Sequence, residues 1–453
     1  MNVNAQPQVF PMVYEVKSLC HCLSFVVLVA ASAAGEGVAQ FRGPEGNGVF
    51  ADSVPQAWDS EKNVKWAVDI PGGGWSSPVA AEGLIFLTTA VSEDDTKPKG
   101  FGEGVRSMGD FYRSQAPDKP YSFEVHCINE TDGNLVWKQS VASRIPPHKI
   151  HPSNSYATES PVTDGNRVYA FFASVGVVAA LDREGKQVWS RDVGAYKTGN
   201  DFGTGSSLAL NDGMLFIQYD NEEKSFVVAL SCDTGNEVWR DDRPSGTSWS
   251  SPVIWRNQTR TELVVCGSGT VTGYNPADGT VLWKLTGTGG AYSASPTFDS
   301  KRLYLGQSGR TSRGPLVAID SGASGEMTLD DVGAGKLAWV VDNAGPGMCS
   351  PVVANDRVYV LSRGILNCHD AETGEVIYKQ RLNNASSVTS SLWASGDAIF
   401  AINESGETSV VKVSDDFELA GTNQIEGLFW SSPTATESKL LVRSASKLYC
   451  IAE

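Results

Sequence analysis

The sequence predicts an all-β protein, an eight-bladed β-propeller of four-stranded blades. Three observations predict it. A short motif before an apolar run recurs eight times, a hairpin followed by an aromatic residue recurs six times, and the last repeat lacks one strand. Short strands separated by turns and repeated about every 40–45 residues are typical of propellers.

The repeat is clearest between Trp249 and Trp283. A Trp-Ser-Ser-Pro motif opens it and leads into an apolar run. Two further strands are predicted over Glu262 to Gly267 and Thr270 to Tyr274, because both stretches are rich in β-branched residues. A turn containing Asp278 and Gly279 then leads to a fourth strand around Trp283. These four strands make one blade.

The blade-opening motif recurs eight times and ends in Pro or Leu each time. The intervals between those end positions are 83, 47, 44, 44, 55, 41 and 41 residues. The two long intervals place insertions in the first and fifth blades. The eight motifs begin at Trp75, Thr158, Gly205, Trp249, Ser293, Met348, Thr389 and Trp430.

A blade-closing motif recurs six times, as a glycine-containing turn followed four residues later by an aromatic side chain. The glycine supplies the positive φ of a tight hairpin. We predict that the aromatic side chain packs between neighbouring blades. The seventh blade departs from the pattern, since Asp415 to Glu418 holds no such glycine and no Trp. The aromatic residues are Trp137, Trp189, Trp239, Trp283, Trp339 and Tyr378.

The two ends of the chain are predicted to share the eighth blade. Its C-terminal part supplies three strands, the last over Lys447 to Ile451. The missing strand is available in Asn63 to Val68, where Trp66 matches the aromatic residue of the other blades. Pairing the first and last strands closes the ring and removes two open sheet edges.

These boundaries define the predicted domain organisation. Residues 63–453 form a single propeller with insertions at 92–120, 142–156 and 321–335. Residues 40–62 contain many turn residues and are predicted to be a lead-in segment on the surface.

The N-terminal region is interpreted as a secretory signal peptide covering residues 1–39. Its apolar core, Leu23 to Ala31, is too short to span a membrane as a helix. Met12 is an alternative start that shortens the segment before this core, and a buried strand is the alternative interpretation. We therefore expect an exported protein, in the periplasm or outside the cell, with no transmembrane segment in the mature chain.

Charge and motifs exclude several functions. The net charge is −16 without a basic stripe, which argues against nucleic acid and anionic membranes as partners. His148 and His151 lack the further ligands of a zinc site. Glu326, Asp330 and Asp331 lack the alternation of a calcium-binding loop. We therefore predict no metal site, and no residue pattern identifies a catalytic group.

The candidate binding residues lie where the blade-opening motifs begin, since the innermost strands should start near the channel mouth. Trp75, Trp249 and Trp430 could there stack on a sugar ring, a flat cofactor or a partner's side chain. Alternatively, these indoles pack against the insertions or plug the channel. Further candidates, from the same position or from neighbouring loops, are Thr158, Met348, His151, Tyr156 and Asp201.

The repeat resembles pyrroloquinoline-quinone-type (PQQ-like) β-propeller repeat proteins, over residues 41–453. The resemblance is carried by closing motifs such as Val228 to Trp239, and by Phe41 to Pro44, which resembles exported bacterial members. It implies the propeller fold. It leaves the function open, because the superfamily includes both quinoprotein dehydrogenases and the non-catalytic propeller of outer-membrane protein assembly.

The resemblance allows one comparison of chemistry. Quinoprotein dehydrogenases of this type bind PQQ with Ca²⁺ and carry adjacent cysteines beside the quinone. The cysteines after the signal peptide are not adjacent, and we expect them to be small buried hydrophobic residues. They are Cys127, Cys232, Cys266, Cys349, Cys368 and Cys450.

The sequence therefore favours a non-catalytic binding or scaffold protein. Its expected partner is a protein of the cell envelope or a small planar or sugar ligand at the Trp-lined mouth. The alternatives are a PQQ-dependent dehydrogenase, a carbohydrate-active protein and a structural unit of a larger envelope complex. PQQ with Ca²⁺ is the cofactor that the first alternative requires.

Overall fold

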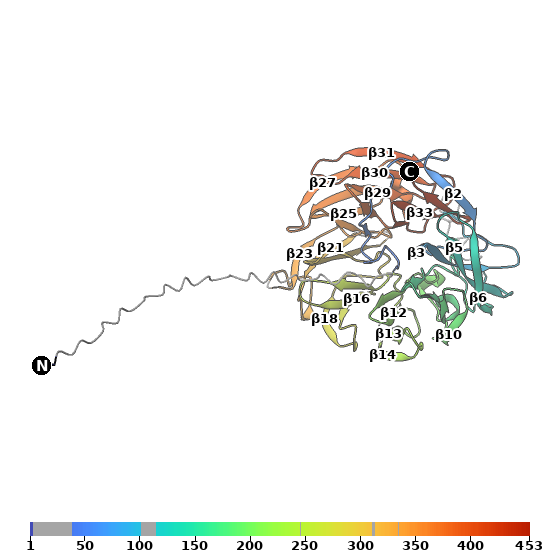
Figure 1. The fold of residues 1–453 in the computed structure, drawn as a ribbon, viewed down its shortest axis with the longest axis horizontal. Helices are drawn as coiled ribbons and strands as arrows, with labels where there is room; N and C mark the ends of the chain where they lie inside the picture. The colour runs from blue at the N-terminus through green and yellow to red at the C-terminus, as the bar shows by residue number, and fades with distance from the viewer. Residues whose placement is uncertain (3–38, 101–114, 245, 310–312, 334) are drawn as a thin grey trace. The chain divides into compact units, whose positions relative to one another are not determined.

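The computed structural model describes residues 1–2, 39–100, 115–244, 246–309, 313–333 and 335–453. Residues 3–38 of the predicted signal peptide and residues 101–114 of the 92–120 insertion lie outside these residues. Eight sheets of the C-terminal unit radiate from a common centre, as Figure 1 shows. This confirms the predicted all-β, eight-bladed propeller. In the described residues, no helix is long and apolar enough to cross a membrane.

The four strands that form each blade pair antiparallel, and in the first seven blades they follow one another in the chain from the centre outwards. The first four blades are β3 (Val79–Ala81), β4 (Leu84–Val91), β5 (Tyr121–Asn129) and β6 (Leu135–Arg144); β7 (Val162–Thr163), β8 (Arg167–Phe172), β9 (Val177–Asp182) and β10 (Gln187–Asp192); β11 (Ala209–Asn211), β12 (Met214–Tyr219), β13 (Phe226–Ser231) and β14 (Glu237–Asp242); and β15 (Val253–Arg256), β16 (Thr261–Gly267), β17 (Thr270–Tyr274) and β18 (Val281–Thr286).

The other four blades follow the same plan. They are β19 (Thr297–Phe298), β20 (Arg302–Ser308), β21 (Arg313–Asp320) and β23 (Leu337–Val341); β24 (Val352–Ala354), β25 (Arg357–Ser362), β26 (Ile365–Asp370) and β27 (Val376–Arg381); β28 (Trp393–Ser395), β29 (Ala398–Ile402), β30 (Glu407–Lys412) and β31 (Leu419–Gln424); and β32 (Thr434–Thr436), β33 (Lys439–Arg443), β34 (Lys447–Ile451) and β2 (Val64–Asp69). Short 3₁₀ turns cover Ala173–Val175, Gly199–Asp201 and Ala385–Ser387.

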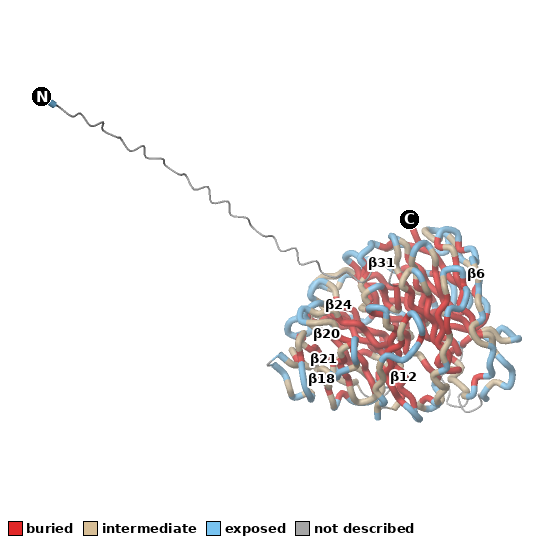
Figure 2. The backbone as a smooth tube through the Cα atoms, turned by 60° about the horizontal axis from the view of Figure 1, so that its bottom comes forward, coloured by how far each residue is buried: buried red, intermediate tan, exposed pale blue. Residues whose placement is uncertain are grey.

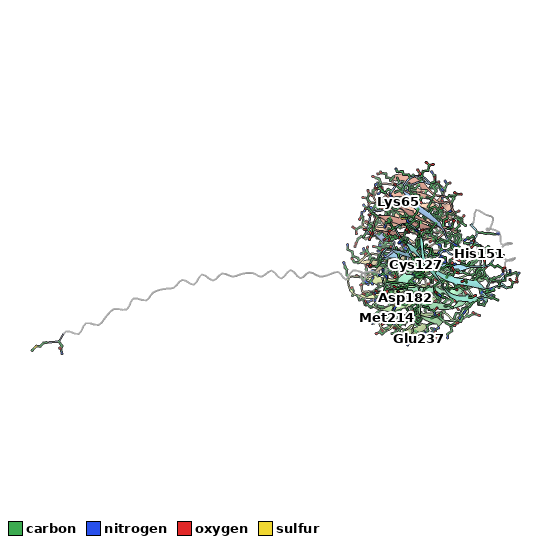
Figure 3. The ribbon with its side chains drawn as sticks, turned by 45° about the vertical axis from the view of Figure 1, so that its right-hand side comes forward. Lys65, Cys127, His151, Asp182, Met214 and Glu237 are labelled. Carbon is green, nitrogen blue, oxygen red and sulfur yellow. The ribbon has the colours of Figure 1, made fainter. Side chains whose placement is uncertain are left out.

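The ring closes as the sequence predicts. Strand β2 pairs antiparallel with β34, with Trp66 opposite Cys450 and Asp69 opposite Lys447. Lys65 of β2 accordingly lies among the C-terminal strands in Figure 3. The first strand of the ring, β2, thus completes the last blade as its fourth strand.

The core lies between neighbouring blades. Tyr169 and Phe171 of the second blade, for example, pack in one cluster with Leu215 and Ile217 of the third. Figure 2 shows buried residues running through the sheets, with exposed residues mainly in the outer connections. All six cysteines of the described residues are buried and unpaired, as expected. Burial raises the pKa of Cys127 to about 12, so its thiol is unreactive.

Five closing-motif tryptophans each tie their own blade to the next one, which confirms the predicted packing of these five side chains. The indole of Trp189 donates to the carbonyl of Cys232 at 2.8 Å and lies against Gly235 of the next blade's hairpin. A Cβ on Gly235 would lie 2.6 Å from the ring, so this glycine is required by contact as well as by its φ of +67°. Equivalent indole-to-carbonyl bonds are made by Trp66, Trp137, Trp239 and Trp339.

Trp283 also packs between blades, in one cluster with Leu303 and Leu305 of the fifth blade, but its indole bonds differently. Its indole donates to Glu262 of its own blade at 2.5 Å and is fully buried. The insertion at 321–335 also alters this blade, because β22 (Gly325–Met327) pairs parallel with β18 and becomes its fifth strand. The predicted acidic loop therefore contains a strand, and Glu326 belongs to it.

The prediction that the lead-in lies on the surface is wrong for much of its length. Arg42 and Trp58 are only 2% and 3% exposed. Strand β1 (Val49–Phe50) pairs parallel with β28 and is the innermost strand of the seventh sheet. The lead-in therefore runs inside the ring of innermost strands as far as β1, and then passes outwards to β31, where the backbone N–H of Trp58 donates to Asn423. Few local sequence signals indicate this path.

The lead-in also contacts blades on several sides of the channel. Ala39, directly before the lead-in and the last residue of the predicted signal peptide, forms a β-bridge with Thr163 in the second blade. The guanidinium of Arg42 donates to the carbonyl of Pro296 at 2.7 Å and to that of Pro351. Asn47 donates to the carbonyl of Phe298. One segment thus cross-links blades that are far apart in the sequence.

Candidate functional site

A cavity of about 1060 Å³ lies where the innermost strands begin. All eight blade-opening motifs contribute to its wall, so it lies on the axis of the ring. Phe41 lines it from the lead-in, and the neighbouring Arg42 is anchored beneath the motifs of the fifth and sixth blades. The lead-in therefore closes the inner end of the cavity.

A ring of serine side chains surrounds this cavity. The third residue of every blade-opening motif is serine, and all eight of these serines line the wall. Six hydrogen bonds join neighbours around the ring, the backbone N–H of one serine donating to the hydroxyl of the next. The bonds run from Ser77 to Ser160, Ser160 to Ser207, Ser207 to Ser251, Ser251 to Ser295, Ser295 to Ser350 and Ser391 to Ser432, at 2.9–3.0 Å.

The serine ring explains why the motif repeats. A buried backbone N–H needs a hydrogen-bond acceptor, and at the crowded axis the neighbouring blade supplies it through a short side chain. Sequence reasoning missed this role, although the signal was present: serine is the one residue type shared by all eight motifs at the same position.

The three predicted tryptophans all line the cavity, but their indole N–H groups already have acceptors. Trp75 and Trp430 stack on each other, with ring centroids 5.7 Å apart and planes 18° from parallel. Trp75 donates to the carbonyl of Ser153, and Trp430 to the carboxylate of Glu404. They form a wall braced by neighbouring residues, and whether they also stack on a ligand stays a prediction.

Trp249 belongs to a second aromatic group of the cavity wall. Its indole donates to the carbonyl of Gly203, and its ring packs against Phe202 at a centroid distance of 6.1 Å. Phe202 also meets the edge of His151. Because Phe202 remains 39% exposed, this group presents apolar surface to the cavity.

The other predicted residues divide between the cavity and its surroundings. Thr158, Met348 and His151 line the wall, and Met348 is 45% exposed. Tyr156 is buried instead, against Tyr121, and its hydroxyl donates to the carbonyl of His148. Asp201 is not among the lining residues and pairs with Lys149 and Lys197.

Glu159 is the unexpected ionisable residue beside the cavity. It lies between two lining residues, Thr158 and Ser160, yet its own side chain is fully buried. Neither carboxylate oxygen has a hydrogen bond of good geometry among the described residues, although the Thr204 hydroxyl lies close enough to favour the ionised form. Burial raises the pKa of Glu159 to about 7, so the carboxyl holds its proton in mildly acidic solution.

The charged residues of the wall are few. Arg363 and His151 are the ionisable groups among the described lining residues, and none is Asp or Glu. Burial lowers the pKa of His151, whose Nδ1 lies 2.7 Å from the hydroxyl of Ser153. The wall offers hydroxyls, amides and aromatic faces, which suit binding better than acid–base or nucleophilic chemistry.

The wall does not fit PQQ with Ca²⁺. Calcium takes oxygen ligands that usually include carboxylates, and the described lining residues supply none. Cys349 lies beside the lining residue Met348, but its thiol is buried and has no adjacent cysteine. Across the described part of the chain, no three His, Cys, Asp or Glu side chains are grouped to hold a metal ion.

Comparison with known proteins gives one family match. The family described as outer membrane protein assembly factor BamB matches residues 121–259, 174–416 and 323–448, which together cover more than half of the chain. The proteins of that name from Yersinia pestis and Moranella endobia (strain PCIT) are 25% and 22% identical over 276 and 258 residues. These alignments span 56% and 54% of this chain and 63% and 62% of those proteins, less than two thirds of their length.

Solved structures agree on the fold. BamB from Moraxella catarrhalis superposes with a TM-score of 0.57 at 11% identity, covering 86% of this chain and 97% of that one. A europium-containing methanol dehydrogenase superposes with a TM-score of 0.58 at 10% identity, covering 93% and 99%. Because enzymes and an assembly factor superpose equally well, the fold alone does not separate the two functions.

Proposed function

The chain belongs to the family described as outer membrane protein assembly factor BamB, and on that premise we propose that it is a non-catalytic scaffold of the cell envelope. It binds a protein partner at the cavity mouth and contributes to the assembly of outer-membrane proteins. The predicted export of the chain places it in the required compartment.

The composition of the cavity wall is the observation that carries this proposal. The wall is built from hydroxyls that already hold the ring together and from indoles whose N–H groups are satisfied. At the rim, Met348 and Phe202 expose apolar surface. A rigid ring with an apolar rim and no grouped reactive side chains among the described residues suits protein binding.

Site-specific cross-linking tests this proposal. A photo-reactive residue at Met348, on the rim, is compared in the native envelope with one at Val238, which is 51% exposed on the outer strand β14. We expect a defined adduct with an outer-membrane assembly component from position 348 and none from position 238. Deletion of the gene should also lower the amount of folded outer-membrane protein.

Two outcomes count against the scaffold. Unchanged levels of folded outer-membrane proteins after deletion would remove the assembly role. Equal adducts from both positions would show that the contact is non-specific and that the rim is not the docking site.

The quinoprotein alternative is tested separately. Because the wall lacks carboxylates for Ca²⁺, we propose that the protein works without PQQ. A thermal-shift titration with PQQ and Ca²⁺ should leave the melting temperature unchanged, since only a ligand that binds the native state raises it. A saturable rise that disappears in Trp430→Ala would revive the dehydrogenase. The same titration with disaccharides tests the sugar-binding alternative.

A further inference from the structure

We propose that the cavity selects an acidic segment of its partner: a loop or chain end that carries carboxylates beside an apolar side chain. This inference rests on the proposed function, because it names the chemistry of the partner that the scaffold binds. Three features of the wall lead to it: the hydroxyl ring, the distribution of charge and the closed shape.

The serine ring presents hydrogen-bond donors to the cavity. Each linked hydroxyl oxygen accepts a backbone N–H from the preceding blade, so its own hydrogen is still available to donate. Within the described residues, none of the eight hydroxyls donates to a protein acceptor at hydrogen-bond distance, and the oxygen of Ser77 has no partner. A ligand rich in acceptor oxygens, such as a carboxylate, satisfies such a ring.

Charge is distributed unevenly between the cavity and the rest of the molecule. Asp and Glu make up 52 of 453 residues, so a wall of 32 residues would hold about four (32 × 52/453) if acids were spread evenly. The described wall holds none, while Arg363 supplies a positive charge. Glu404, next to the wall, is 7% exposed and accepts the indole N–H of Trp430. The described wall residues therefore offer a cationic ligand no carboxylate of their own.

The shape selects an end or a loop over a threaded chain. Phe41 closes the inner end, so a ligand enters and leaves through the same mouth. The volume of about 1060 Å³ is at the upper limit of small-molecule sites and accommodates several side chains. Phe202 and Met348 line its wall and keep apolar surface exposed, so an apolar residue beside the carboxylates completes the fit.

Fluorescence anisotropy with labelled peptides tests this selectivity on the full mature chain. The probe is a fluorescein-labelled hexapeptide with alternating Asp and Phe, and the matched controls replace Asp by Asn or by Lys. We expect saturable binding of the Asp peptide, weaker binding of the Asn peptide and none of the Lys peptide. Citrate, added as a competitor, distinguishes a free small anion from a peptide as the preferred source of the carboxylates.

Charge substitutions at the rim locate the site. Met348→Lys should raise the affinity for the Asp peptide and Met348→Glu should lower it, each by roughly fivefold at low salt. Both are surface changes at a 45% exposed position, so folding should be retained. Val238→Glu, on the outer edge of the third blade, makes the same change in net charge and should leave the affinity unchanged.

Several results would overturn the inference. These are equal binding of the Asp and Asn peptides, equal effects of Met348→Glu and Val238→Glu, and binding of citrate with no binding of peptide. The scaffold function is separable from it. If the cross-link from position 348 persists while the Asp peptide fails to bind, the scaffold stands and only the acidic preference is wrong.

Discussion

Glu159 is the residue at which this chain departs most from its own repeat. The equivalent position in the other seven blades carries a small side chain, at Ser76, Ser206, Ser250, Ala294, Cys349, Ser390 and Ser431. A buried carboxyl that makes no well-formed hydrogen bond with the described residues is costly when ionised. Its position beside a cavity makes Glu159 a candidate for a role other than packing.

The pH dependence of stability should reflect this carboxyl. Its pKa is raised from 4.5 to about 7 in the folded protein, so the folded state holds a proton that the unfolded state releases between these values. Stability should therefore fall as the pH rises from about 4.5 to 7 and stay reduced above. Glu159→Gln should be more stable than the wild type by about 3 kcal/mol at pH 8 and nearly equal to it at pH 4.5.

Urea unfolding at the two pH values measures this difference. The matched control is Glu184→Gln in an exposed turn, which should not change the pH dependence. If Glu159→Gln keeps the wild-type dependence on pH, the carboxyl is ionised in the folded protein and has a partner outside the described residues.

At the scale of elements, the closing hairpin and the tryptophan of the preceding blade form one unit. Gly235 has φ +67°, and its missing side chain leaves room for Trp189. Gly213, in a hairpin of the same blade, has φ +70°, but a Cβ at this position would meet no atom within 4 Å. Substituting each of these two glycines separates the free-energy cost of backbone strain from the cost of disturbing the inter-blade contact.

Gly213→Ala should cost only the strain of a left-handed conformation, about 1–2 kcal/mol. Gly235→Ala should cost about 2 kcal/mol more, because the Trp189 ring must move away. Chemical denaturation of both variants measures the difference. Equal losses would mean that the seam adapts without cost and that the indole does not hold the blades in register.

The lead-in is the second element with a testable role. Arg42 is buried and bonds to carbonyls of the fifth and sixth blades, and among the described residues it has no carboxylate partner. Arg42→Met should lower the unfolding free energy by about 3 kcal/mol, since it leaves buried carbonyls without donors. Arg42→Lys keeps the charge but not the planar fork, so its loss should be smaller.

Limited proteolysis follows the same variants. Arg42→Met should expose the lead-in to cleavage between residues 40 and 60 before the blades are cut. Equal stability and equal cleavage in Arg42→Met and Arg42→Lys would assign the effect to packing and not to the hydrogen bonds.

At the scale of the whole molecule, ring closure depends on one strand pair. Asp69 and Lys447 face each other across β2 and β34 and form an exposed ion pair at 2.7 Å. Opposite residues of antiparallel strands lie close enough for a disulfide. Asp69→Cys with Lys447→Cys should therefore oxidise readily and raise the unfolding free energy by about 2–4 kcal/mol.

Non-reducing electrophoresis and denaturation with and without dithiothreitol measure this lock. The control pairs Asp69→Cys with Lys439→Cys, at the far end of β33, and should not cross-link. Failure of the first pair to oxidise would contradict the register of the closing blade.

The blade architecture could be predicted because its signals are local. Each hairpin glycine, each strand and each following tryptophan lies within a single repeat, so the number of blades and the shared last blade follow from counting. The position of Trp75, Trp249 and Trp430 at the cavity follows in the same way, because equivalent residues of a ring lie at equivalent heights. The serine ring was equally visible, as one residue type at one position.

Other features depend on contacts between distant parts of the chain. Arg42 reaches Pro296 and Pro351, 254 and 309 residues away, and no periodic pattern marks such a contact. The same holds for the stacking of Trp75 on Trp430 and for the burial of Tyr156 against Tyr121. The repeat thus determines the ring, because each blade carries its own instructions. Only the folded ring decides how its centre is filled, because that space exists only once all eight blades have met.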